Sequence, residues 1–349
     1  MSLPPPILLL EAQQRLLSEV EPLETETVAT EAALGRYLAQ DLHAGRTQPC
    51  ADLSAMDGYA MRADDLAGPW RIVGESAAGR PFAEPLASGE AIRISTGAMM
   101  PAGAGAVLLQ EDAAREGEHL RAVPTGEPAP RHIRRAGFDF RKGDRLLEAG
   151  ALIDPARMAL ALSGGHGTLV THRRPSLAIL DSGDELAADP VACAPHQIPA
   201  SNGAMLAALA APHAGQVTRL GPVADRIEAI LAALDRAEAV DVLVTSGGAS
   251  VGDHDLVRPA LEQWGATIDF WRVAMKPGKP VLVARRGRQW VVGLPGNPVS
   301  SYVTAFLFLL PLLRALAGAN ALIERPARSP AAASGETVSC YLLANGGSA

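Results

Sequence analysis

The sequence predicts an α/β protein: a mostly parallel sheet with helices on both faces, joined to a separate β-rich domain. Three observations support this prediction. From Pro175 to Ala319, short apolar runs alternate with helical segments, which is typical of a parallel sheet covered by helices. Between Cys50 and Gly137, short apolar runs alternate with Gly and Pro turns, which indicates a small β-rich domain. The chain has 349 residues, enough for two or three domains of ordinary size.

The N-terminal half contains an amphipathic helix, short strands and a connecting segment. Leucines recur at helical spacing over residues 7–20, with Glu and Arg between them, and preceding prolines favour the start of this helix. The apolar runs at 91–94 and 106–110 predict strands of the β-rich domain. Residues 143–171 connect this domain to the rest of the chain, and 156–163 within them predict a helix.

The C-terminal half alternates strands with helices. Residues 239–245 are nearly all apolar, as in a strand that is buried on both faces. Ser201 or Asn202 can cap the predicted helix at 205–210. In chain order, the strands are predicted at 176–181, 216–220, 239–245, 268–273, 281–284 and 290–294, and the helices at 205–210, at 225–236, in a segment ending at 264 and in a segment after 297.

Composition and charge exclude several classes of function. The chain is 48% hydrophobic and 20% charged, so it can bury substantial cores. Its net charge is -7 and its pI is about 5.7, which argues against a broad nucleic-acid surface because such a surface needs clustered positive charge. The three cysteines lie far apart in the sequence, so we expect neither a disulfide framework nor a zinc site.

The sequence also indicates no membrane segment. The N-terminus lacks the basic start, apolar core and small-residue cleavage site of a signal peptide. The most apolar stretch, 302–316, is shorter than the ~20 residues of a membrane span, and Pro311 interrupts it. We therefore expect a buried helix there and a cytoplasmic protein.

Four short segments suggest a site for a phosphorylated ligand and a divalent metal. Asp181–Glu185, Thr245–Asp255 and Gly293–Ser301 each follow an apolar run, and Met275–Pro280 carries two lysines on a Pro-Gly turn. In parallel sheets, ligands bind beyond the carboxyl ends of the strands, where three of these segments lie. Glycine loops and lysines suit an anion, whereas the neighbouring carboxylates would repel it unless a metal bridges the two.

The glycine and lysine segments are candidates for binding the anion. Glycines allow a tight turn that points several N–H groups into one concavity, and the following helix start adds a favourable dipole. A plain strand-to-helix turn is the alternative explanation. Lys276 and Lys279 would supply point charges for an oxyanion, or would simply be solvated surface lysines. The candidate ligand-binding residues of the glycine segments are Ser246, Gly247, Gly248, Ser250, Gly252, Pro295, Gly296 and Asn297.

Carboxylates are the candidates for binding the metal. Magnesium prefers hard oxygen ligands and usually keeps water and substrate phosphates in its shell. The candidate ligands are Asp184, Glu185, Asp253 and Asp255, for each of which helix capping is the alternative. Asn297 can cap the last helix, since Pro298 suits the first helical turn. Asp57 lies in an Asp-Gly turn, which by itself is weak evidence for a functional role.

Taken together, these motifs resemble the MoeA family of molybdopterin molybdenumtransferases, which is related to the C-terminal part of gephyrin. The resemblance extends from about Pro4 to Ala319. It is strongest in the segments Ser54–Ala60, Ser95–Ala98, Ser182–Leu186, Thr245–Asp255, Met275–Pro280 and Gly293–Ser301.

The resemblance implies a division of the chain into domains. The α/β part is expected to be a MogA-like molybdopterin-binding domain over 175–319, with the N-terminal helix of 1–25 packed on it. Residues 50–137 are the expected β-rich domain. Residues 26–49 and 138–174 are the expected elongated linking and dimerisation region. Residues 320–349 are expected to be a short, poorly ordered tail in place of the C-terminal β-barrel domain of family members.

The resemblance also implies the last step of molybdenum cofactor synthesis, in which molybdate is inserted into adenylylated molybdopterin with Mg²⁺-dependent release of AMP. Metal-assisted cleavage of the phosphoanhydride is the expected chemistry. The family is dimeric, with a cleft between the α/β domain of one subunit and the β-rich domain of the other. Expected partners are a second copy, a molybdopterin adenylyltransferase and the molybdoenzymes that receive the cofactor.

Matching the family motifs gives roles to individual residues. Asp57 and Thr96 from the β-rich side are implied to be catalytic. From the α/β domain, Asp184 and Asp255 are implied as site residues. Outside that domain, Arg135 and Asp139 are further ligand-binding candidates. The implied catalytic residues of the α/β domain are Glu185, Asp225, Lys276 and Lys279.

The chain departs from the family pattern in one loop: Ala200-Ser-Asn202 stands where the family usually has Asp-Ser-Asn. Two other functions remain as alternatives. A molybdopterin adenylyltransferase would use the α/β domain alone, so the presence of Ser54–Ala60 and Ser95–Ala98 argues against it. A non-catalytic molybdopterin-binding or scaffold protein would keep the fold without turnover.

Overall fold

The computed structural model describes residues 5–247, 256–319, 321–324 and 339–342, and its contacts divide the chain into two units. The first unit comprises residues 1–40, 148–158 and 168–349, and the second comprises 41–147 and 159–167. Each unit has its own sheet and its own hydrophobic cores. The predicted combination of an α/β sheet and a β-rich domain is therefore confirmed.

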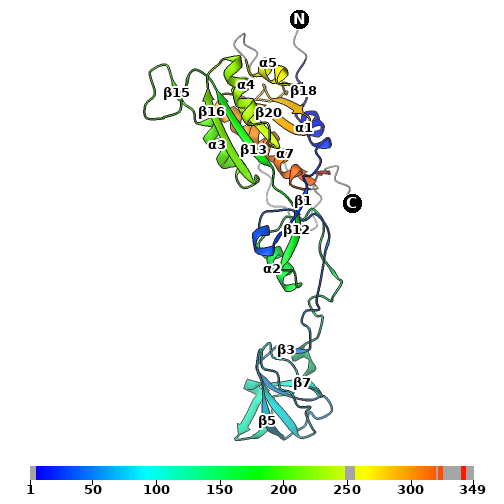
Figure 1. Cartoon of the computed structure of the whole chain (residues 1–349). Helices are drawn as coiled ribbons and strands as arrows, with labels where there is room; N and C mark the ends of the chain where they lie inside the picture. Colours follow the sequence, from blue (N-terminus) through cyan, green and yellow to red (C-terminus); the bar gives the residue numbers. More distant parts are fainter. Residues whose placement is uncertain (1–4, 248–255, 320, 325–338, 343–349) are drawn as a thin grey trace. The chain divides into compact units, whose positions relative to one another are not determined.

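The α/β sheet of the first unit has six strands in the order β16-β13-β17-β20-β19-β18 (Figure 1). The first four strands pair in parallel, whereas β19 runs antiparallel to both of its neighbours. The sheet is thus mostly parallel, as predicted. Its strands are β13 (Ser176–Ser182), β16 (Gln216–Val223), β17 (Val242–Ser246), β18 (Thr267–Trp271), β19 (Leu282–Arg286) and β20 (Gln289–Leu294).

Helices cover both faces of this sheet because its strands are apolar on both sides. On β13, Leu177 and Ile179 belong to one buried cluster, and Ala178 and Leu180 belong to another. This alternation follows from the two-residue period of a strand. The first cluster includes α1 (Leu9–Ser18), α3 (Asn202–Ala210), α7 (Leu310–Leu316) and the turn Ala305–Leu309 between α6 (Pro298–Thr304) and α7, and the second includes α4 (Ile227–Arg236) and α5 (Val257–Gln263).

The most apolar helix continues through Pro311, which the sequence predicts to interrupt it. It runs continuously over Pro298–Leu316, a 19-residue span that is apolar and long enough to cross a membrane by length and composition, with 56% of its most apolar window buried. A π-helical turn at Ala305–Leu309 precedes Pro311. Because proline cannot donate the usual helical hydrogen bond, this wider turn lets the helix continue through it. Phe308, Leu312 and their neighbours pack into the core, so this is the buried helix that the sequence predicts.

The remaining elements of the first unit are short. β1 (Thr25–Ala29) pairs antiparallel with β12 (Thr168–His172), and β14 (Leu186–Ala187) pairs in parallel with β15 (Ile198–Pro199). Helix α2 (Pro155–Ser163) continues from the first unit into the second. After Ala319 the sequence predicts no regular structure, but the backbone forms an antiparallel pair, β21 (Ala321–Glu324) with β22 (Ser339–Leu342).

The second unit is built on a six-stranded sheet in the order β7-β4-β6-β5-β9-β8 (Figure 1). Only β5 and β6 pair in parallel in this sheet. Two short antiparallel pairs accompany it, β3 (Leu53–Ser54) with β10 (Ile133–Arg134) and β2 (Leu42–His43) with β11 (Arg145–Leu147). The sheet strands are β4 (Gly58–Arg62), β5 (Trp70–Ser76), β6 (Glu90–Ile94), β7 (Ala104–Leu109), β8 (Ala113–Glu116) and β9 (His119–Ala122).

Candidate functional site

A cavity of about 370 Å³ lies at the carboxyl edge of the α/β sheet. This is the edge at which ligands bind in parallel sheets, because the loops that follow the strands converge there. The sequence predicts a site at this edge, and three of its four segments contribute to the cavity wall. The lining residues are Asp181, Ser182, Glu185, Leu186, Ile198, Pro199, Ala200, Ser201, Asn202, Ser246, Gly247, Gly296, Asn297 and Pro298.

Asp181 lines this cavity near the end of β13 and is only 3% exposed. Burial raises the pKa of its carboxyl to about 6, against the opposing effects of Arg219, the Gly203 amide and the Ser246 hydroxyl. The sequence prediction includes Asp181 only as the first residue of the segment Asp181–Glu185 and gives it no role. Its position at the end of an apolar strand could have indicated a site residue. The burial of the Asp181 carboxyl, however, depends on its being covered by α3, which the sequence does not show.

Asn202 connects three segments of the cavity wall. Its Nδ2 donates to Ser246 Oγ at 2.9 Å and to the Gly296 carbonyl at 2.8 Å. The predicted capping of α3 is therefore wrong for both candidates: Asn202 is the first helical residue and bonds elsewhere, and Ser201 occupies the N-cap position without a side-chain bond to the helix. The Asn202 side-chain amide instead links α3 to β17 and to the loop after β20, where its two hydrogen-bond acceptors lie.

The loop after β20 has the structure that the sequence predicts. Asn297 caps α6 by accepting a hydrogen bond from Ser300 N at 3.1 Å, and Pro298 lies in the first turn. Both residues line the cavity together with Gly296. Pro295 is buried at the base of the loop and is not a lining residue.

Three carboxylates beside the cavity, Asp184, Glu185 and Asp225, are near enough to influence one another electrostatically. The Asp225 amide donates to Asp184 Oδ1 at 3.1 Å. Burial, followed by the neighbouring charges of Asp184 and Glu185, raises the pKa of Asp225. This crowding of like charges, made of hard oxygen ligands, fits a divalent cation. Of the three, only Glu185 lines the cavity. Within the described residues, no three acidic, His or Cys side chains gather closely enough to form a complete metal site.

The two lysines do not line the cavity. Lys276 and Lys279 are exposed on a turn whose central Gly278 is buried against α6. Gly278 has φ +98°, and a Cβ there would lie 2.4 Å from Thr304 Cγ2, so only glycine allows this packing. The turn is therefore anchored to the helix whose N-terminus borders the cavity, while its lysine side chains extend outside it.

Five predicted residues lie outside the described part of the chain. They are Gly248, Ser250, Gly252, Asp253 and Asp255. The described start of this segment, Ser246 and Gly247, lines the cavity, and Gly247 has φ +93°.

In the second unit, Asp57 and Thr96 form a tight exposed pair. Asp57 Oδ1 accepts from Thr96 N at 2.7 Å and from Thr96 Oγ1 at 3.0 Å. These two bonds, the amide first, lower the pKa of the Asp57 carboxyl, with a further contribution from the Arg93 charge. Asp57 is therefore held in one orientation as a carboxylate, and the two segments that the sequence analysis singled out separately are in contact.

Arg135 and Asp139 are engaged in different ion pairs of the second unit. Arg135 Nη1 lies 2.6 Å from Asp52 Oδ2, and Asp139 pairs with Arg134. Their side chains are partly exposed and do not bond to each other.

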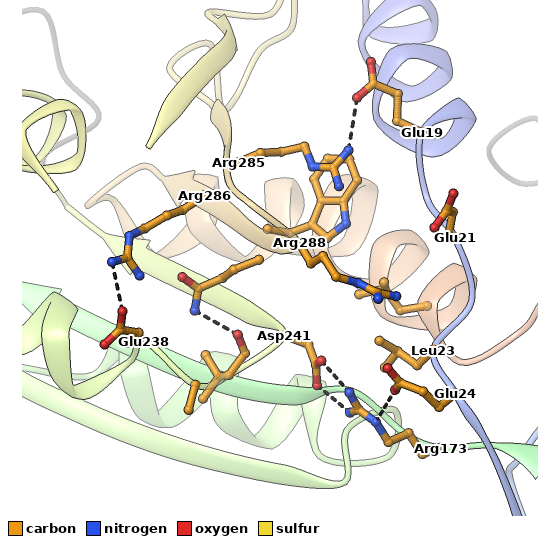
Figure 2. A pocket seen from close by; sticks show the side chains of 15 residues that line it. Glu19, Glu21, Leu23, Glu24, Arg173, Glu238, Asp241, Arg285, Arg286 and Arg288 are labelled. Atoms are coloured by element: carbon orange, nitrogen blue, oxygen red, sulfur yellow. Dashed lines mark hydrogen bonds and ion pairs between the residues drawn. The ribbon is translucent and has the colours of Figure 1, made fainter. Parts of the chain in front are cut away.

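A second cavity, of about 380 Å³, lies at the opposite edge of the α/β sheet (Figure 2). Its charged residues mostly neutralise one another: Arg173 pairs with Asp241 and Glu24, and Arg286 pairs with Glu238. Around the parallel strands, its lining residues Arg173, Asp241 and Gln289 precede or begin a strand rather than follow it, so the cavity lacks the converging loops of the first one. We therefore assign the candidate site to the cavity at the carboxyl edge.

Comparison with known proteins identifies the family. Residues 7–165 match the MoeA N-terminal region (domain I and II), and residues 178–315 match a probable molybdopterin binding domain. The chain is 35% identical over 315 residues to a molybdopterin molybdenumtransferase of Haemophilus influenzae, covering 88% of this chain and 77% of that protein. A Bacillus subtilis molybdopterin molybdenumtransferase is 34% identical over 322 residues, with 88% and 74% covered.

A solved structure agrees with this identification. A molybdopterin biosynthesis MoeA protein from Pyrococcus horikoshii OT3 superposes with a TM-score of 0.75 at 26% identity, covering 91% of this chain and 82% of that one. The matched families span both described units. The chain therefore belongs to the MoeA family, whose named relatives are molybdopterin molybdenumtransferases.

Proposed function

We propose that this chain is a molybdopterin molybdenumtransferase that inserts molybdate into adenylylated molybdopterin and releases AMP. The observation that carries the proposal is the cavity at the carboxyl edge of the sheet, in a chain that belongs to the MoeA family. The cavity combines a glycine turn, a capped helix N-terminus and carboxylates. This combination suits a ligand with phosphate groups on one side and a neutral ring on the other.

The phosphates would be held by the chain's own N–H groups and lysines. The α6 N-terminus at Asn297, which borders the cavity, would offer amide donors to an oxyanion. Lys276 and Lys279, on the turn anchored to α6, would reach towards the ligand from outside the cavity.

Asp184 and Glu185 would hold Mg²⁺, together with Asp253 and Asp255 from the segment outside the described residues. Magnesium would neutralise the charge of the phosphoanhydride and act on it as a Lewis acid. Burial is the main cause of the raised pKa of Asp225, and the charges of Asp184 and Glu185 add to it. A cation bound by these carboxylates would relieve the repulsion between them.

Asp57 would act at the reacting group from the second unit. Thr96 holds its carboxylate through two hydrogen bonds, so its orientation is set before the substrate arrives. As a carboxylate of lowered pKa it would accept a proton or orient water at the phosphoanhydride. We further propose that the chain acts in the cytoplasm as a homodimer, exchanging ligands with a molybdopterin adenylyltransferase and with molybdoenzymes.

Release of AMP tests this function directly. Wild type, supplied with adenylylated molybdopterin, Mg²⁺ and molybdate, is expected to release AMP only when molybdate is present. Asp57→Asn should lower the rate by about 100-fold or more, the usual contribution of a positioned acid or base. Asp64→Asn removes an exposed carboxylate that pairs with Arg62 in the same unit, and it should leave the rate unchanged.

Other results of this assay would contradict the role of Asp57 or indicate a different function. Equal release by wild type and Asp57→Asn would show that the role given to Asp57 is wrong. Consumption of ATP without a molybdate requirement would indicate an adenylyltransferase. Binding of adenylylated molybdopterin with no turnover under any condition would indicate a scaffold protein.

A further inference from the structure

Asp181 is a buried carboxylate in the wall of the candidate cavity that forms no ion pair with any described residue. It is 3% exposed, and its nearest cationic influence is the charge of Arg219 on β16. Ion pairs elsewhere in the first unit lie well within 4 Å, as between Arg173 and Asp241 at 2.7 Å. Asp181 therefore carries a charge that the fold itself leaves largely uncompensated.

The fold has made space for this carboxylate. A Cβ on Gly203 would lie 2.0 Å from Asp181 Oδ2, so only glycine in the first turn of α3 allows the carboxyl to lie there. The Gly203 amide and the Ser246 hydroxyl lie close enough to this carboxyl to lower its pKa, against the effect of burial. An ionised carboxyl has about four acceptor positions, so acceptor capacity remains on the side of the cavity.

A structural role does not explain this carboxylate. A raised pKa means that burial disfavours the charged form, so the ionised side chain destabilises the fold at neutral pH. A buried charge without a partner is normally avoided unless a ligand, a metal or a proton compensates it. We therefore expect the group that compensates the charge of Asp181 to be one that enters the cavity.

The neighbouring groups favour a hydrogen-bond donor as this partner. Among the described residues of the cavity wall, the other titratable side chain is Glu185, also a carboxylate. The Asn202 Nδ2 and the Ser246 hydroxyl are already committed to protein acceptors, Gly296 O and Asp181 among them. The phosphates of a ligand would be repelled here and belong near the glycine turn and the α6 N-terminus. The part of the ligand beside Asp181 must then carry N–H donors.

We propose that Asp181 is the specificity-determining residue that accepts N–H donors from the ring of the ligand. This inference rests on the proposed function, under which that ring is a pterin. A pterin presents a 2-amino group beside a ring N–H, two adjacent donors that a carboxylate can accept together. Asp181 thus assigns the ring end of the ligand to the wall formed by β13 and α3, and the phosphate end to the wall at Gly247 and the α6 N-terminus.

Two pteridines that differ at one position test the proposal. Pterin carries the 2-amino donor, whereas lumazine has a carbonyl acceptor in its place. Titration of wild type with each compound, followed by the fluorescence of the pteridine, should show about tenfold or more tighter binding of pterin, because a carboxylate rejects a ligand that lacks the donor. Asp181→Asn should lose this preference, since an amide can donate to the carbonyl of lumazine.

The controls separate recognition from folding and from turnover. Glu238→Gln removes a carboxylate at the opposite edge of the sheet and should keep the preference for pterin. Asp181→Asn should unfold at a temperature no lower than wild type at pH 7.5, which a purely structural carboxylate would not allow. Molybdate-dependent AMP release that Asp57→Asn abolishes would support the function whatever the pteridine result.

Clear results would overturn the proposal. Equal affinity of wild type for pterin and lumazine, or no binding of pterin at all, would show that Asp181 does not accept from the ring. An unchanged preference in Asp181→Asn would show the same. These results leave the proposed function intact if AMP release depends on molybdate and Asp57.

Discussion

Two aspartates at opposite edges of the α/β sheet show how environment decides the state of one residue type. Asp241, before β17, receives two bonds from Arg173 at 2.7 Å each and two more from Ser176 at 2.7 Å each. Burial would raise the pKa of Asp241, but these bonds outweigh it and lower the pKa. Asp181 has no such partner, and burial raises its pKa to about 6. The first carboxylate stabilises the fold, and the second is available to a ligand.

This difference predicts opposite effects of pH on stability. The folded state of Asp181 binds its proton at about pH 6 and the unfolded state near 3.8, so its penalty is complete above pH 6 and is relieved as the pH falls towards 4. Replacing it by Asn should therefore remove up to about 3 kcal/mol of pH-dependent destabilisation, at 1.36 kcal/mol per unit of pKa. Denaturant unfolding of wild type and Asp181→Asn between pH 4.5 and 8 measures this difference in the free energy of unfolding.

Asp241→Asn is the matched comparison with the opposite sign. The lowered pKa of Asp241 means that its stabilisation is complete above the ordinary carboxyl range and is lost only as the pH falls below it. This variant should be less stable than wild type by about 3 kcal/mol at pH 7, because it breaks a largely buried ion pair. Parallel pH profiles of the two variants would contradict both assignments.

The elements follow from periodicity, but their direction and length depend on packing. Apolar runs correctly predicted every strand of the α/β sheet, yet nothing in the run at 282–286 indicates that β19 lies antiparallel to β20. Pro311 indicates an interruption of the last helix, whereas the π-helical turn at Ala305–Leu309 lets the helix pass through it. Local sequence limits the possible elements, and tertiary contacts select among them.

The last helix offers a test of which of its faces stabilises the fold. Phe308 is fully buried in the core, while Phe306, two positions earlier, is 55% exposed. Phe308→Ala should lower the free energy of unfolding by about 3–5 kcal/mol, because it removes a buried ring and leaves a cavity. Phe306→Ala should change it by about 0.5 kcal/mol or less. Urea denaturation compares the two variants, and similar losses in both would show that this face of the helix is assigned incorrectly.

Over the whole molecule, the two units are built around separate cores. Ile92 belongs to a buried cluster formed only by residues of the second unit, and Val244 belongs to a cluster of the first. Units with their own cores can unfold as separate cooperative steps. The proposed function nevertheless needs both, since Asp57 and Thr96 lie in the second unit and the cavity lies in the first.

Calorimetry is expected to resolve this organisation. Ile92→Ala should lower the transition temperature of the second unit and leave the other transition in place, because the removed contacts lie within one core. Val244→Ala should produce the reverse pattern. A single transition that both variants shift equally would show that the two units unfold together.

The sequence alone predicts much of the fold and part of the candidate site. The strand–helix alternation, the Asn297 cap with Pro298, and the gathering of glycine and carboxylate segments at one sheet edge all follow from local patterns. The first two depend on neighbours in the chain, and the third follows from the rule that the carboxyl ends of parallel strands meet at one edge, so a single sequence is sufficient to predict all three. The resemblance to the MoeA family, carried by the same segments, is confirmed by the family matches.

Other features arise only when distant segments meet. Asn202 joins Ser246 and Gly296 instead of capping its helix, and Lys276 and Lys279 lie outside the cavity. Asp181 becomes a candidate recognition residue only because Gly203 of α3 lies against it. Burial and charge compensation are properties of the surroundings, which the order of residues along the chain does not state, and they decide which of several similar carboxylates is left to meet a ligand.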